Sequence, residues 1–225
     1  MSSSRLLSLV RSLASDSSLY PSTAPSVPKI ISPKIISLEG NIGAGKSTLL
    51  KAVDAGLLES ERGIIVCMQE PVDLWESVRD SDGESILKKF YRDPAKYAFA
   101  FQIMAYTSRL EALKRVLSEN PLCRVLVCER SLEADKNIFA LMLHDDGLID
   151  SVSYQVYMML FANTACQYSV DLVVHLDVDP EECLVRVGKR ARDGEGEIGL
   201  EYLTKCHEYY LAWISSMESG KVIRI

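Results

Sequence analysis

The 225-residue sequence has no apolar run of about 18 residues, the length that a membrane-spanning helix needs, so we expect no membrane partner. It also lacks an excess of positive charge, because 25 basic side chains stand against 31 acidic ones and the net charge is −6. A protein whose main partner is nucleic acid usually carries a basic face or groove, so we expect no nucleic-acid partner. A phosphorylated small molecule still fits if basic side chains gather locally.

Histidine is scarce, and cysteine lacks the spacing of a metal site. His144, His175 and His207 are far apart, and no C-x-x-C pair occurs, so we expect no structural metal. The six cysteines are Cys67, Cys123, Cys128, Cys166, Cys183 and Cys206. Because Cys67 and Cys128 lie inside apolar runs, we expect buried free thiols in a reducing compartment rather than disulfides.

Residues 1–33 are poor in acidic side chains, with Asp16 alone, and rich in Ser and Pro. Two interpretations stay open: a flexible tail, or an organellar transit peptide, since Arg5 and Arg11 give the segment the composition of one. An apolar helical face could be formed by Leu6, Leu9, Val10 and Leu13. We leave this segment out of the fold and expect a cytoplasmic protein, or a mitochondrial one if the segment is a transit peptide.

From residue 34 to residue 225, short apolar runs alternate with helical patterns. We expect strands at 35–38, 64–68, 125–128, 172–176 and 222–225, and helices at 47–58, 84–91, 94–119, 131–145, 150–167, 179–192 and 199–216. Continuously apolar strands separated by helices predict an α/β domain with a five-stranded parallel sheet and helices on both faces. The carboxyl ends of the strands then meet at one edge, where ligands bind in such sheets.

One stretch between a predicted strand and a predicted helix fits the pattern G-x-x-x-x-G-K-[ST], the phosphate-binding P-loop. Its glycines let consecutive backbone N–H groups point at phosphate oxygens, and the helix N-terminus adds partial positive charge. Lys46 would reach the outer phosphates, and Ser47 would help to hold Mg²⁺. The predicted nucleotide-binding residues are Gly40, Asn41, Ile42, Gly43, Ala44, Gly45, Lys46, Ser47 and Thr48.

Charged residues also follow the other predicted strands. Glu70 comes directly after the second strand, and Glu129 and Arg130 follow the third. The helix after the fourth strand is basic, with Arg186, Lys189, Arg190 and Arg192. All of them belong to the edge at which the P-loop lies.

Five short motifs occur in series: Gly40–Ser47, Glu70-Pro71-Val72 with Trp75, Glu129-Arg130-Ser131, Arg190-Ala191-Arg192, and Tyr202-Leu203 with His207 and Trp213. This series, over residues 34–215, resembles the deoxyribonucleoside kinases, which include the deoxycytidine, deoxyguanosine and mitochondrial thymidine kinases. The resemblance implies a three-layer P-loop kinase fold. It further implies an enzyme that uses ATP and Mg²⁺ to phosphorylate the 5′-hydroxyl of a deoxynucleoside in nucleotide salvage. A homodimer formed through the helices between the third and fourth strands is also implied.

The resemblance assigns catalytic roles. Glu70 resembles the general base that takes the 5′-hydroxyl proton, and Glu129 the carboxylate that holds Mg²⁺ through water. Arg130 is similar to the arginine at the transferring phosphoryl group, and Arg190 and Arg192 to the lid arginines over the ATP phosphates. The alternatives without a catalytic role are a solvated or capping acid at Glu70, a structural Glu129–Arg130 ion pair, and an exposed basic helix face.

The long helix would supply the nucleoside site. Gln102 matches the glutamine that reads the base edge, and Gln102, Tyr106 and Arg109 share one helical face. The further substrate residues implied by the resemblance are Trp75, Tyr91, Phe101, Phe139 and Glu195, of which Tyr91 and Glu195 would bind the 3′-hydroxyl. Arg109 and Asp135 match an Arg and an Asp near the base in the deoxycytidine and deoxyguanosine kinases. Such a pair would crowd a thymine methyl group, which favours deoxycytidine, deoxyadenosine or deoxyguanosine over thymidine.

Other P-loop proteins are the alternatives. A nucleoside monophosphate kinase needs basic side chains at its acceptor phosphate, where this sequence has Glu70, and like charges repel. A P-loop NTPase switch protein that binds guanine would carry an N-K-x-D run, which is absent. A non-catalytic homologue would be expected to lack Lys46, Glu70 or Arg130, and all three are present.

Overall fold

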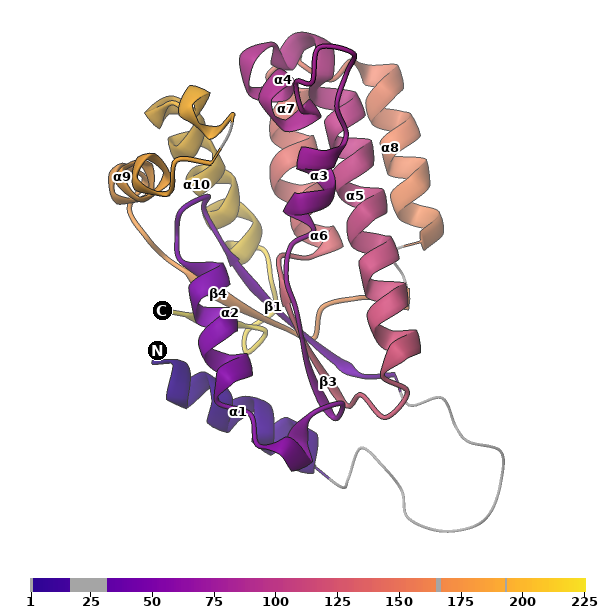
Figure 1. Ribbon diagram of the computed structural model, residues 1–225, viewed down its shortest axis with the longest axis vertical. Helices are drawn as coiled ribbons and strands as arrows, with labels where there is room; N and C mark the ends of the chain where they lie inside the picture. The colour runs from indigo at the N-terminus through magenta and orange to yellow at the C-terminus, as the bar shows by residue number, and fades with distance from the viewer. Residues whose placement is uncertain (1, 17–31, 165–166, 193) are drawn as a thin grey trace.

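The computed structural model describes residues 2–16, 32–164, 167–192 and 194–225. Its five strands are β1 (Lys34–Gly40), β2 (Ile65–Met68), β3 (Val125–Glu129), β4 (Leu172–Leu176) and β5 (Val222–Arg224). They form one sheet in the order β2-β3-β1-β4-β5, and every pairing is parallel (Figure 1). The predicted five-stranded parallel sheet is therefore confirmed.

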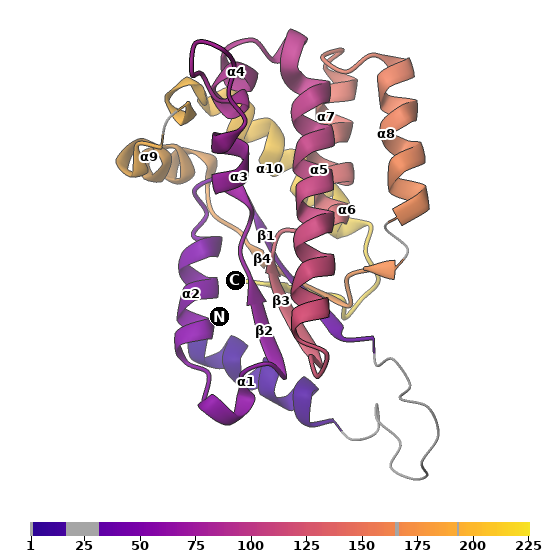
Figure 2. The ribbon, with the colours of Figure 1, turned by 45° about the vertical axis from the view of Figure 1, so that its right-hand side comes forward.

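The helices are α1 (Ser3–Ser15), α2 (Lys46–Ala55), α3 (Val72–Ser77), α4 (Ile86–Arg92), α5 (Pro94–Glu119), α6 (Leu132–Ala134), α7 (Leu141–Asp145), α8 (Ser151–Thr164), α9 (Pro180–Arg190) and α10 (Leu200–Ser215). Helices α1 and α2 cover one face of the sheet, and α5 and α8 lie on the other (Figures 1 and 2). The predicted three layers are thus present, as the P-loop kinase fold requires.

Alternation along the strands explains why both faces are covered. In β1, Ile36 and Leu38 pack in the same cluster as α1 and α2, whereas Ile35 packs in the cluster of α5. In β3, Val127 faces the first cluster and Leu126 the second. Successive strand side chains point to opposite faces, so a strand that is apolar at every position needs helices on both.

Helix α1 differs from the expectation for residues 1–33. Residues 3–15 form a helix that buries Leu6, Leu7, Val10 and Ala14 in the core beside α2 and the sheet. The expectation that this segment stands outside the fold is therefore wrong for residues 3–15. Their apolar face packs against α2 and the sheet. The rest of the predicted tail, residues 17–31, lies outside the described residues.

Two contacts show how closely α1 fits α2. Gly56 follows α2, and a Cβ atom there would lie 2.6 Å from Cδ2 of Leu7, so the missing side chain makes room for α1. Arg11 binds the carboxylate of Glu61 through Nε and Nη2, at 2.6 and 2.9 Å, and donates to the carbonyl of Gly56 at 3.1 Å. Helix α1 therefore packs closely against the carboxyl end of the P-loop helix.

The segment predicted as one helix at 131–145 has three parts. A π-helical stretch, Asp135–Ala140, separates α6 from α7. A π-helical turn contains an extra residue, and such turns are frequent at functional sites. Here the stretch begins with Asp135, one of the predicted base-site residues.

Every cysteine among the described residues is a free thiol. Cys123, Cys128, Cys183 and Cys206 are buried free thiols and Cys67 is a half-buried one, as expected, while Cys166 lies outside the described residues. Within the described ranges, no helix is both long and apolar enough to cross a membrane.

Candidate active site

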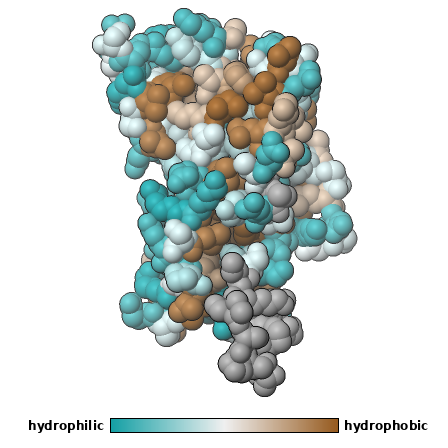
Figure 3. Space-filling view, turned by 90° about the vertical axis from the view of Figure 1, so that its right-hand side faces the viewer, coloured by the Kyte–Doolittle hydropathy of each residue, from teal (hydrophilic) through white to brown (hydrophobic). Residues whose placement is uncertain are grey.

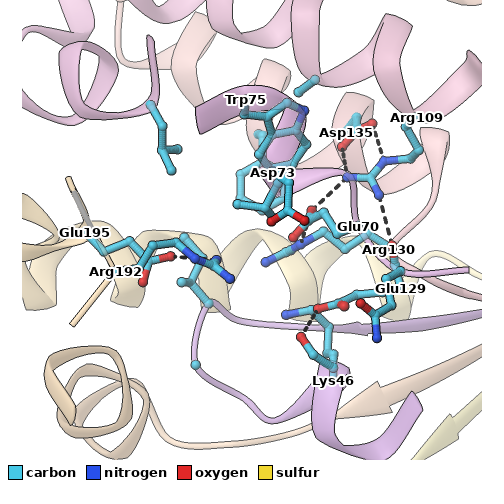
Figure 4. Close-up of a pocket in the computed structure, with 18 of the residues that line it drawn as sticks. Lys46, Glu70, Asp73, Trp75, Arg109, Glu129, Arg130, Asp135, Arg192 and Glu195 are labelled. Atoms are coloured by element: carbon cyan, nitrogen blue, oxygen red, sulfur yellow. Dashed lines mark hydrogen bonds and ion pairs between the residues drawn. The ribbon is translucent and has the colours of Figure 1, made fainter. Parts of the chain in front are cut away.

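A cavity of about 320 Å³ opens at the carboxyl edge of the sheet. Its walls come from the P-loop, the residues after β2 and β3, the middle of α5, and the segment between α9 and α10 (Figure 4). The cavity therefore lies where the parallel sheet predicts a ligand site. A second hollow continues along the outer side of the P-loop, towards Arg186, Arg190 and Arg192.

The P-loop has the backbone that phosphate binding needs. Gly43 has φ +85°, and a Cβ atom there would lie 2.5 Å from the carbonyl oxygen of Cys183, so only glycine fits. Lys46 is buried and donates from Nζ to the carbonyls of Gly40 (3.1 Å) and Asn41 (2.7 Å). Burial and the nearby Arg130 lower its pKa to about 8. The ammonium group is thus held by weak neutral partners that phosphate oxygens can replace.

Two oxygen donors stand beside the P-loop at the start of α2. The Ser47 hydroxyl donates to Oε1 of Glu129 at 2.7 Å, and Glu129 is buried at the end of β3. A hydroxyl and a carboxylate fit a hard cation such as Mg²⁺, which prefers oxygen ligands. The structure therefore places the two predicted metal residues together.

The carboxylate of Glu70 forms ion pairs with two arginines. Nη2 of Arg109 lies 2.8 Å, and Nε of Arg130 3.1 Å, from the same carboxylate oxygen, Oε1 (Figure 4). Burial acts against ionisation of this carboxyl, but the charges of Arg130, Arg109 and Lys46 outweigh it and lower its pKa to about 2. Glu70 is thus ionised at physiological pH, and it is not the solvated or capping acid of the non-catalytic alternative.

The predicted Arg109–Asp135 pair is present. Nε of Arg109 lies 2.8 Å from Oδ2 of Asp135, and both side chains are buried. Nη1 of Arg109 also donates to the carbonyl of Glu129 at 2.9 Å. One guanidinium group therefore binds the predicted base-site acid, the predicted catalytic carboxylate and the end of β3. The arrangement leaves Arg109 little freedom to move alone.

Two aromatic residues, Trp75 and Phe101, line the cavity near α5. Trp75 packs edge-on against Phe101 with ring centroids 5.6 Å apart, and its Nε1 donates to Ser108 at 2.8 Å. Gln102 is 2 % exposed, and its Oε1 has no hydrogen-bond partner among the described residues. A buried amide oxygen at a cavity wall is costly unless a ligand donor satisfies it, as predicted for the base-reading glutamine. Tyr106 instead packs against Tyr157 in the core.

The two arginines that are predicted to form a lid bind one acid. Arg190 binds Glu195 through Nε and Nη2, each with a contact at 3.0 Å or less, and Nη1 of Arg192 lies 3.2 Å from the same carboxylate. Both arginines line the cavity, so they are not simply an exposed basic face. Arg186 belongs elsewhere, because it donates to the P-loop carbonyl of Ala44. Tyr91, predicted at the 3′-hydroxyl, lines the same cavity.

Two buried polar residues behind the cavity were not predicted. Glu39, in β1, and Tyr210, in α10, are each 0 % exposed and bond to one another and to groups of the site. Glu39 directly follows the predicted strand 35–38, and an acidic residue at the end of a buried strand is a signal that could have found it. Tyr210 has no such signal, because a tyrosine on an amphipathic helix is most often core.

A P-loop, a pair of arginines and an ionised carboxylate around one cavity are the features of a phosphotransferase. The carboxylate at the acceptor end favours an uncharged hydroxyl over a phosphate. A family model described as "Deoxynucleoside kinase" matches residues 36–225. The chain belongs to the deoxynucleoside kinase family and is an enzyme that phosphorylates deoxynucleosides. This membership decides against a nucleoside monophosphate kinase or a switch protein.

Curated relatives agree on the class and differ in the base. The chain is 34% identical over 184 residues to the "Probable deoxycytidine kinase" of fowlpox virus, covering 81% of this chain and 72% of that protein. It is 34% identical over 192 residues to the deoxyadenosine kinase of Dictyostelium discoideum, covering 84% and 71%. It is 33% identical over 187 residues to the thymidine kinase of Ictalurid herpesvirus 1, covering 82% and 75%.

Proposed function

We propose that this enzyme transfers the γ-phosphoryl group of ATP to the 5′-hydroxyl of deoxycytidine, deoxyadenosine or deoxyguanosine, in preference to thymidine. The observation that carries the proposal is the arrangement of Glu70, Arg109 and Asp135. An ionised carboxylate and a base-site ion pair share one guanidinium group at the acceptor end of the cavity. Gln102, with its unpaired amide oxygen in the same wall, would bind a donor group on the base.

In this mechanism Glu70 accepts the proton of the 5′-hydroxyl. A carboxylate with a pKa of about 2 is a weak base, so the proton moves only when the hydroxyl oxygen is already bonding to phosphorus and has become acidic. Such timing suits the loose transition state of phosphoryl transfer. Arg130, 3.1 Å from Glu70, is placed to offset charge on the transferring group at the same moment.

Lys46, Arg190 and Arg192 act on the donor side. Each would exchange its present oxygen partners for phosphate oxygens. The positive charge that binds the phosphates is therefore already in the site. Ser47 and Glu129 would hold Mg²⁺, which would neutralise part of the phosphate charge. The cavity walls then exclude water from the transferring group.

The base preference depends on room near Arg109 and Asp135. Both side chains are buried and joined by two contacts, at 2.8 and 3.2 Å, so neither can turn aside cheaply for a thymine methyl group. The names of the relatives include deoxycytidine, deoxyadenosine and thymidine kinases and do not choose among the bases. The ion pair is therefore the basis of the preference.

Phosphorylation assays with the four deoxynucleosides and ATP test this proposal. We expect thymidine to have the lowest kcat/KM, and Glu70→Gln to lower kcat by at least about 100-fold with every substrate. Glu59→Gln is the matched control, since that side chain is 95% exposed and does not line the cavity. Thymidine as the best substrate contradicts the preference, and an unchanged rate in Glu70→Gln contradicts the role as base.

The homodimer also belongs to this proposal. Apolar side chains gather over α8 on the face shown in Figure 3, where Val152 is 70% exposed, Val156 50% and Met159 66%. This helix lies between β3 and β4, the region predicted to pair with a second copy. We expect wild-type protein to sediment as a dimer and Val156→Arg to weaken that dimer, since the substitution would bury a charge. A wild-type monomer at micromolar concentration would contradict the pairing.

The cytoplasmic location is favoured over the mitochondrial one by α1. A transit peptide is removed after import, and removal here would take Leu6 and Val10 out of the core. Mass spectrometry of the N-terminus of protein purified from its own cells tests the point. A mature N-terminus beyond residue 16 would restore the transit-peptide interpretation.

A further inference from the structure

Arg130 is held in an unusual conformation directly after β3. Its φ of +63° lies in the left-handed region that non-glycine residues rarely adopt, and its N–H donates to the carbonyl of Leu38 at 3.0 Å. The side chain is 4% exposed and lies over the ring of Phe139, with Cζ 4.7 Å from the ring centroid. Strained backbone of this kind persists where the surroundings over-determine it, often at a functional site.

The guanidinium group of Arg130 contacts two polar groups on different sides. Nε faces Glu70 at 3.1 Å, and Nη1 donates to the hydroxyl of Tyr210 on α10. The Tyr210 ring packs between His175, at 5.7 Å between centroids, and Phe139, at 6.4 Å. The hydroxyl oxygen is therefore fixed in place by the packing of its ring.

Glu39 orients that hydroxyl. Tyr210 donates to Oε2 of Glu39 at 3.3 Å, while Oε1 accepts from Ser37 at 2.5 Å and from Ser131 at 2.7 Å. A tyrosine hydroxyl has one proton and accepts with its lone pairs. Because the proton is directed at the carboxylate, a lone pair is left for Nη1 of Arg130.

Burying the Glu39 carboxylate costs free energy, which indicates that this arrangement serves the function of the enzyme. Glu39 is 0% exposed, its hydrogen bonds come from the hydroxyl groups of Ser37, Ser131 and Tyr210, and burial raises its pKa to about 6. A buried carboxylate without a directly bonded cation is expensive, and apolar residues of similar size often stabilise a fold better. Neither Glu39 nor Tyr210 lines the cavity, so direct contact with substrate does not explain them.

We propose that Tyr210 and Glu39 are positioning residues that fix the guanidinium group of Arg130 for phosphoryl transfer. The proposal rests on the role of Arg130 in the proposed function. Glu39 directs the Tyr210 proton, Tyr210 accepts from Arg130, and Arg130 is thereby aimed at Glu70 and the transferring group. A helix that follows the lid in the chain is in this way joined to the reaction centre.

The first test is Tyr210→Phe, which removes the hydroxyl and keeps the ring. We expect kcat per folded site to fall about tenfold, equivalent to about 1.4 kcal/mol, while the KM of the nucleoside changes less than about twofold. Tyr209→Phe is the matched control, because that hydroxyl lies on the same helix and donates to Asp145 at the surface at 2.6 Å. Tyr209→Phe should keep the wild-type kcat.

The second test separates positioning from stability. Glu39→Gln should lower kcat as Tyr210→Phe does, and the double variant should be no worse than either single variant, since both act through one hydroxyl. A kcat per folded site within about twofold of wild type in Tyr210→Phe overturns the proposal, whether or not the melting temperature falls. If Glu70→Gln and Arg130→Met also stay active, the proposed function fails instead. Inactivity of those two with a fully active Tyr210→Phe leaves the function standing and removes only the positioning role.

Discussion

Replacing Leu6 by alanine tests whether α1 is part of the folded enzyme. Leu6 is 0% exposed and belongs to the apolar cluster that α1 forms with α2 and the sheet. Its neighbour Val10 is equally buried, so the surroundings cannot collapse easily into the space that Leu6→Ala would leave. A cavity of that kind costs both the lost transfer free energy and the unfilled volume.

Leu6→Ala should lower the free energy of unfolding by about 3 kcal/mol, the lower part of the range for buried leucines. In a domain of this size each kcal/mol corresponds to about 2–4 °C, so the melting temperature should fall by about 6–12 °C. The loss cannot exceed the free energy with which α1 docks, because the helix can detach while the remainder stays folded. The size of the change therefore sets a lower limit on the free energy with which α1 docks.

Thermal unfolding followed by circular dichroism gives the result, and Leu58→Ala supplies the control at a leucine that is 59% exposed. The control should melt within about 2 °C of wild type, since exposed substitutions have small effects. Equal melting temperatures for Leu6→Ala and Leu58→Ala would refute the reasoning, for α1 would then be resting on the domain without stabilising it.

Three other changes probe the site. Arg109→Met removes a positive charge from Glu70, so the pKa of Glu70 should rise and the acid limb of the kcat/KM profile should move to higher pH; an unmoved limb would contradict the charge assignment. Arg192→Ala should lower kcat at least about tenfold and raise the KM for ATP, as initial rates over a series of ATP concentrations would show. Burial raises the pKa of Glu39 from 4.5 to about 6, which means that the folded state holds the proton more tightly. The free energy of unfolding of the wild-type protein, relative to that of Glu39→Gln, should therefore fall by about 2 kcal/mol as pH rises from 4.5 to 7. Urea unfolding of both proteins across this range measures the difference. A constant difference would show that Glu39 does not titrate in this range.

The sheet and the P-loop were predictable because their signals are local. Each buried parallel strand is a short apolar run, and β4 matches its predicted range, 172–176. The pair Arg109–Asp135 was predicted through the family resemblance, whereas the π-helical stretch that begins at Asp135 was not, because no residue pattern marks it. Local pattern and resemblance together thus supplied most of the site.

Two features could not be predicted from local patterns. The sequence indicated an apolar face on the 13-residue helix α1, but not that this face would be buried beside α2 and the sheet, and that burial is what makes so short a helix stable. Glu39 and Tyr210 are 171 residues apart, and their contact depends on how α10 crosses the sheet. Long-range packing of this kind is absent from any window of sequence.

Glu195 links the two halves of the cavity. It pairs with Arg190 and Arg192, which we assign to the donor phosphates, and we expect the same carboxylate to meet the sugar 3′-hydroxyl. A ligand that alters one of these pairings alters the free energy of the other, and the effect is reciprocal. The two substrates should therefore bind cooperatively: the dissociation constant of the nucleoside should depend on the presence of a donor nucleotide, and that of the donor should change by the same factor when the nucleoside is bound.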